Sequence, residues 1–145
     1  MDVNIGSFLA RRADISPDRE AYVDSATGFR LSFAALNQRV NQLAHQLRSQ
    51  GVGQGDRVAL CLMNSAEFIE SFLAVAKAGG VVVPLNWRLV ADELEFIIKD
   101  SGAKTMIFGT EFETVVSDLA ARGDKTDVRH WLQVGGQCLP FAEEY

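Results

Sequence analysis

The sequence predicts an α/β fold: a mainly parallel sheet with helices on both faces and a short β-hairpin near the N-terminus. Short apolar runs alternate with helical patterns from residue 58 onward, and glycines follow most of the helical patterns. Strands separated by helical crossovers pair in parallel, with right-handed connections. The first of these runs is continuously apolar, which is typical of a strand covered on both faces.

Residues 1–50 are predicted to form a helix, a hairpin and a long helix. Apolar side chains at helical spacing indicate the first helix: Ile5, Phe8 and Leu9. Two short runs, 21–23 and 29–31, flank a glycine-containing turn and indicate the hairpin. Ser32 is a good N-cap for the long helix, and Gly51 is a good residue to end it. The apolar stripe of that helix consists of Phe33, Leu36, Val40, Leu43, Ala44 and Leu47.

Residues 55–134 are predicted to form a βαβαβαβ unit. The strands are the short apolar runs 58–62, 81–83, 105–108 and 129–134. Asn64 and Glu67 have the spacing of a capping box, as do Thr110 and Glu113. The helix that Asn64 opens is expected to be deeply buried, because apolar residues cover more than half of its circumference. These residues are Phe68, Ile69, Phe72, Leu73, Val75 and Ala76.

Charge and composition exclude several classes of function. The net charge is −5, and no basic run is long enough to follow a nucleic acid backbone. The apolar stretches are much shorter than the ~18 residues that would suggest a membrane span. Cys61 and Cys138 are too few for a disulfide framework, which favours a reducing, cytoplasmic compartment.

Motifs that suggest catalysis lack the required context. Gly51, Gly53 and Gly55 end a helix and precede a strand, whereas a dinucleotide-binding loop follows a strand and opens a helix. His45 and His130 belong to no metal-spaced cluster and to no Ser/His/Asp set. The sequence therefore predicts no catalytic residue and no metal ligand.

Two loops are candidate sites, because ligands of open α/β sheets bind beyond the carboxyl ends of the strands. The loop 63–65 opens a helix whose N-terminus could favour an anion, although Asn64 is more simply a helix cap. The loop 85–88 places Trp87 beside Arg88. Arg88 is either a surface arginine or a ligand for a phosphate group.

Three stretches around these loops resemble the N-terminal region of adenylate-forming enzymes, such as acyl-CoA synthetases, luciferases and non-ribosomal peptide adenylation domains. The stretches are Gly55-Asp56-Arg57-Val58-Ala59-Leu60, Asn64-Ser65-Ala66-Glu67-Phe68, and Ala76-Lys77-Ala78-Gly79-Gly80-Val81-Val82-Val83-Pro84-Leu85-Asn86. The resemblance is strong as far as Phe108 and looser beyond it. Two residues depart from the family pattern: Val90 stands where a Ser or Thr cap is frequent, and Ala35 where an acidic or amide residue is frequent.

The resemblance implies an ATP-dependent, AMP-forming acyl-CoA ligase, which uses ATP, Mg²⁺ and coenzyme A. In that family the phosphate loop and the catalytic lysine lie later in the chain. The resemblance therefore predicts that residues 1–145 are a single incomplete domain, the N-terminal part of a larger ligase, inactive and without cofactor when alone. It also makes Arg88 a candidate contact for a phosphate of coenzyme A.

The alternative is a stand-alone α/β interaction module without catalysis. A small nucleotide-binding protein is disfavoured by the lack of a phosphate loop. If the chain belongs to a ligase, its partners are the remainder of that ligase and a carboxylic acid. Sheet edges and apolar faces that the remainder would cover are then exposed, which predicts self-association of the chain.

Overall fold

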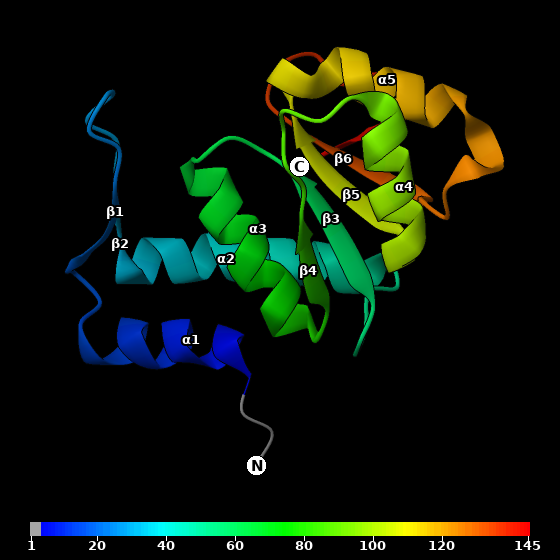
Figure 1. Cartoon of the computed structure of the whole chain (residues 1–145). Helices are drawn as coiled ribbons and strands as arrows, with labels where there is room; N and C mark the ends of the chain where they lie inside the picture. Colours follow the sequence, from blue (N-terminus) through cyan, green and yellow to red (C-terminus); the bar gives the residue numbers. More distant parts are fainter. Residues whose placement is uncertain (1–3) are drawn as a thin grey trace. The chain divides into compact units, whose positions relative to one another are not determined.

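The computed structural model describes residues 4–145 and divides the chain into two compact units. The first unit comprises Met1–Gln54 and Asn64–Gly80, and the second comprises Gly55–Met63 and Val81–Tyr145. The α/β class, the parallel sheet and the separate hairpin are confirmed (Figure 1). The two units differ from the predicted division of the chain in one respect. The first helix of the predicted βαβαβαβ unit, within Asn64–Gly80, belongs to the first unit. That residues 1–145 form one incomplete domain stays a prediction.

The first unit consists of three helices that pack on one another and a two-stranded hairpin. The helices are α1 (Ile5–Ile15), α2 (Phe33–Ser49) and α3 (Ala66–Ala78). The hairpin pairs β1 (Glu20–Val23) with β2 (Arg30–Ser32) in antiparallel register. All of these helices and strands were predicted from the sequence. Only the place of α3 in this unit was not.

Helix α2 begins and ends as predicted. The Ser32 hydroxyl accepts a hydrogen bond from the Ala35 amide at 3.2 Å. Gly51 has a φ of +90° and allows the amide of Val52 to bond the carbonyl of Leu47 at 3.0 Å. These bonds form the left-handed cap that satisfies the last carbonyls of a helix. The predicted stripe is buried except for Phe33, which is half-buried.

The buried face of α1 differs from the expectation. Ile5 and Phe8 are each 58% exposed, and the buried face holds Gly6, Leu9 and Ala13 instead. A Cβ atom on Gly6 would lie 2.7 Å from the backbone nitrogen of Lys77. The missing side chain at Gly6 therefore lets α1 approach the end of α3 closely.

The start and the buried face of α3 also differ from the expectation. The N-cap is Ser65, whose hydroxyl accepts from the Phe68 amide at 3.2 Å, and Asn64 is exposed. Phe72 is 37% exposed, and the half-buried residues are Phe68, Ile69, Leu73 and Ala76. The residues that are buried are mainly small: Ala66, Glu70, Ser71, Ala74, Val75 and Ala78. Small side chains allow α3 to pack closely, and close packing decides which face is inside.

The second unit is built on a five-stranded parallel sheet in the order β4-β3-β5-β6-β7. Four strands lie where the apolar runs predicted them: β3 (Arg57–Cys61), β4 (Val81–Pro84), β5 (Thr105–Gly109) and β6 (His130–Val134). The two-residue strand β7 (Glu143–Glu144) was not expected. Side chains on both faces of β3 are fully buried, as the continuous apolar run indicated.

Helices α4 (Ala91–Ser101) and α5 (Glu113–Ala121) pack together on one side of this sheet (Figure 1). Short 3-10 turns precede and follow α5, at Thr110–Phe112 and Gly123–Lys125. The predicted capping box of Thr110 is wrong, because the 3-10 turn takes its place and α5 has no side-chain cap. Glu113 instead accepts a hydrogen bond from the buried Gln133 of β6 at 2.9 Å.

Candidate functional site

An open cleft of about 760 Å³ lies at the carboxyl ends of the strands in the second unit. Met63 comes just after β3, and Trp87, Leu89 and Val90 follow β4. The opposite wall comes from the segment after β5: Glu111, Phe112, Thr114, Val115 and Asp118. The cleft is therefore mainly apolar, with carboxylates on one side only. This mixture suits a ligand with an apolar body.

The strand order explains why a cleft forms at this edge. After β3 the chain continues to β4, which lies toward one edge of the sheet. After β5 it continues to β6, which lies toward the opposite edge. Neighbouring strands whose connections diverge in this way leave a crevice beyond their carboxyl ends. Met63 and Phe112 lie beyond β3 and β5, respectively.

The loop after β4 holds the arginine that the sequence singled out. The side-chain oxygen of Asn86 accepts from the Arg88 amide at 3.1 Å, which fixes a tight turn. The guanidinium carbon of Arg88 lies 4.9 Å from the centre of the Trp87 ring. This stacking orients the cation beside a cleft-lining side chain, although Arg88 itself does not line the cleft. In residues 4–145 no salt bridge includes Arg88, and it is exposed.

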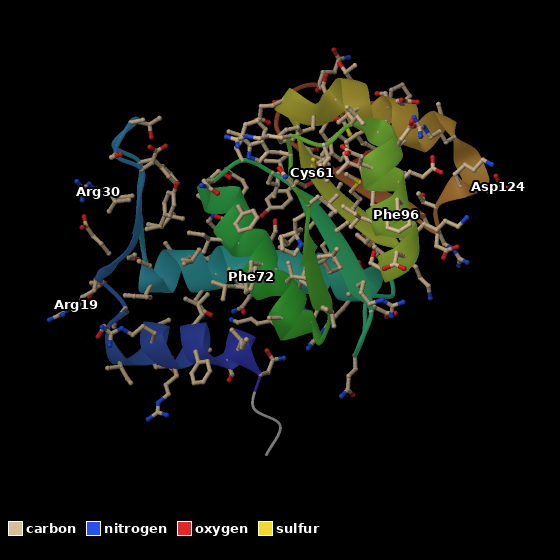
Figure 2. All side chains as sticks on the ribbon, viewed as in Figure 1. Arg19, Arg30, Cys61, Phe72, Phe96 and Asp124 are labelled. Atoms are coloured by element: carbon tan, nitrogen blue, oxygen red, sulfur yellow. The ribbon has the colours of Figure 1, made fainter. Side chains whose placement is uncertain are left out.

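The other groups singled out from the sequence are not brought to the cleft. Cys61, labelled in Figure 2, is fully buried, as expected. Burial, with a smaller contribution from the charge of Glu111, raises the pKa of its thiol to about 12. His130 bonds Glu143 at 2.9 Å and joins β6 to β7. His45 and Asn64 are exposed residues of the first unit.

The wall of the cleft that follows β5 was not predicted from the sequence. The same rule that selected the loops after residues 62 and 84 applies to the end of β5, where Glu111 and Phe112 lie. The signal was present but was interpreted as a capping box. Asp118 also lines the cleft. No sequence motif marked it, because it reaches the cleft only through the helical turn of α5.

The sequence pattern of the family described as "AMP-binding enzyme" matches residues 9–144. The chain belongs to this family. It is 43% identical over 121 residues to a long-chain-fatty-acid–CoA ligase, FadD13, of Mycobacterium tuberculosis, and the alignment covers 83% of this chain and 24% of the relative. A feruloyl-CoA synthase of an Amycolatopsis species is 42% identical over 117 residues, which cover 81% of this chain and 23% of that enzyme.

Solved structures of AMP-binding enzymes have the same fold. The N-terminal domain of FACL13 from Mycobacterium tuberculosis superposes with a TM-score of 0.86 at 41% identity, over 90% of this chain and 33% of that one. A CoA ligase from Rhodopseudomonas palustris, described as a long-chain-fatty-acid ligase, gives a TM-score of 0.87 at 33% identity over 97% of this chain. The chain thus spans about a quarter of the length of the curated relatives it matches.

The described residues hold neither a cluster of three metal ligands nor a glycine-rich loop that opens a helix. Between residues 4 and 145 no three His, Cys, Asp or Glu side chains are grouped so as to hold a metal ion. The glycines that precede β3 form a helix end and a turn, not a loop that opens a helix. No helix in the described part of the chain is long and apolar enough to cross a membrane.

Proposed function

We propose that this chain forms the N-terminal α/β part of an ATP-dependent, AMP-forming acyl-CoA ligase. Such a ligase joins a carboxylate to AMP with release of pyrophosphate, and then passes the acyl group to the thiol of coenzyme A. The family match over residues 9–144 carries this proposal. The relative at 43% identity, named as a CoA ligase, supports it.

The role of these residues in the ligase is to build the parallel sheet, the helices that pack within each unit, and both described walls of the cleft. ATP and Mg²⁺ would be held by parts of the ligase outside this chain, because in the family that the sequence resembles the phosphate loop and the catalytic lysine lie later in the chain. The test is ATP–pyrophosphate exchange and thioester formation by the complete ligase, with fatty, aromatic and small branched acids as substrates. Failure with every acid and with coenzyme A as acceptor would contradict the proposal.

Arg88 is proposed to contact a phosphate of coenzyme A. Its guanidinium is exposed, is oriented by Trp87 and forms no salt bridge with a described residue. In the complete ligase, Arg88→Ala is expected to raise the KM for coenzyme A roughly tenfold, as for loss of one charged hydrogen bond. ATP–pyrophosphate exchange should be unchanged, because adenylate formation does not involve coenzyme A.

The matched control for Arg88→Ala is Lys99→Ala, which removes an exposed cation from α4. This control should leave the KM for coenzyme A unchanged. An unchanged KM in Arg88→Ala, or an equal rise in both variants, would show that Arg88 is an ordinary surface arginine.

We further propose that the isolated chain self-associates and that its setting is cytosolic. Large apolar side chains are exposed on the second unit: Val81 at 48%, Val90 at 62% and Phe96, labelled in Figure 2, at 71%. Val81 lies on β4, an edge strand whose backbone can pair with another strand. The cytosolic setting is supported by two cysteines that form no disulfide.

A further inference from the structure

The first unit contains a second, smaller pocket of about 270 Å³ that the proposed ligase function does not use. The start of α1, the second half of α2 and the end of α3 enclose it. Three basic side chains line it: His45, Arg48 and Lys77. The polar residues around them are Asn4, Ser7 and Asn41. No carboxylate belongs to the lining that the structure describes.

The two permanent cations of this pocket are held by neutral groups. The Lys77 ammonium donates to the side-chain oxygen of Asn41 at 2.7 Å and to that of Asn37. The Arg48 guanidinium donates to the backbone oxygen of Lys77 at 2.7 Å. Across residues 4–145 no salt bridge joins either cation to a carboxylate. No carboxylate of the described residues therefore pairs with their positive charge. Burial lowers the pKa of Lys77.

The start of α1 adds to the positive potential of the pocket. Asn4 caps this helix of 11 residues by accepting from the Gly6 amide at 2.8 Å, and its amide group donates to the carbonyl of Ala76. The first turn of α1 contains no acidic residue. The positive end of the helix dipole thus adds to the charges of Arg48 and Lys77.

The acidic side chains of α1 and α3 lie away from the residues that line the pocket. Asp14 is near the other end of α1, and Glu67 is in the first turn of α3. Glu70 is paired with Arg39 of α2. None of these three lines the pocket. No carboxylate among the residues that line the pocket is available to neutralise it.

We propose that this pocket binds a small phosphate-type oxyanion through Arg48 and Lys77. Its volume is below the ~300 Å³ at which pockets for drug-sized ligands begin, which fits an inorganic anion. Arg48 offers a planar fork for two oxygens, and Lys77 offers a fixed point charge. This site belongs to the first unit and does not depend on the proposed ligase activity.

The test is titration of the untagged 145-residue chain with inorganic phosphate at constant ionic strength, followed by amide NMR. We expect saturable shifts of the Gly6, Ser7 and Arg48 amides with a dissociation constant of about 1 mM or less. Arg48→Gln should raise that constant roughly tenfold. Arg11→Gln, which removes the same charge from an exposed position on α1, should not change it.

A second variant provides the test if the Arg48→Gln chain does not fold. His45→Gln keeps the size of an exposed lining residue but removes any imidazolium charge, and should weaken binding less than Arg48→Gln. Shifts that do not saturate, or that are spread over both units, would overturn the proposal. Equal weakening by Arg11→Gln and Arg48→Gln would overturn it too, because it would indicate a general charge effect.

Discussion

Glu70 is a charged residue at a fully buried position of α3. Its side chain is 2% exposed and accepts hydrogen bonds from the guanidinium of Arg39, one of them at 3.2 Å. Its burial could not be predicted, because the partner lies 31 residues away on another helix. For the same reason, Ser65 and Asn64 could not be separated as caps: both residue types cap well, and only packing chooses between them.

Arg39→Met should lower the free energy of unfolding by about 3 kcal/mol, because it leaves the buried carboxylate of Glu70 without its counter-ion. Urea unfolding of the 145-residue chain measures this change. The control is Arg30→Met, which breaks the ion pair of Arg30 with Glu20 on the hairpin, where both side chains are 57% exposed. That change should be about 0–1 kcal/mol. Equal losses in the two variants would show that burial does not set the cost.

One arginine joins the two helices α4 and α5. Arg122, just after α5, bonds Asp92 and Glu95 of α4 at 2.7 and 2.8 Å and Asp118 of α5 at 2.9 Å. The hydrogen bond from Arg122 holds the pKa of Asp118 below its usual value. No sequence pattern revealed this link. The helices themselves were predictable, because glycines and apolar periods mark them, as at Gly102 and Leu94.

Arg122→Gln should lower the unfolding midpoint at about pH 7, since three carboxylates would then face one another without a cation. The difference from the wild type should shrink toward about pH 3. The pKa of Asp118 in the folded chain is below its ordinary value. Its ion pair therefore stabilises the fold fully above the ordinary pKa, and this stabilisation is lost as the pH falls through the folded pKa. Denaturant unfolding at the two pH values measures this. The exposed Arg129→Gln is the control, and a difference independent of pH would contradict the account.

The fold class and the family were predictable for the whole molecule, whereas the division into units and the cleft were not. Apolar runs such as Val58–Leu62 fix the parallel strands, and the resemblance around Gly79 and Pro84 fixes the family. A helical period does not decide which of two apolar faces is inside, so the exposed positions of Phe8 and Phe72 could not be foreseen. The strand β7 has no apolar pattern, because it consists of two glutamates.

The isolated chain as a whole is expected to self-associate. Light scattering of the isolated 145-residue chain should give a mass above that of a monomer, increasing with concentration. The reason is the exposure of Val81 on an edge strand and of Val90 and Phe96 elsewhere in the same unit. Val90→Lys should reduce the mass, and a monomer at every concentration would contradict the expectation.

We propose that these residues form the scaffold of a ligase whose ATP-binding groups lie elsewhere in the protein. ATP–pyrophosphate exchange tests this proposal when the complete ligase and the 145-residue chain are assayed side by side on the same acids. We predict exchange by the complete ligase, none by the chain alone, and no ATP binding to the chain tighter than about 1 mM. Acyl-adenylate formation by the 145 residues alone would contradict the claim.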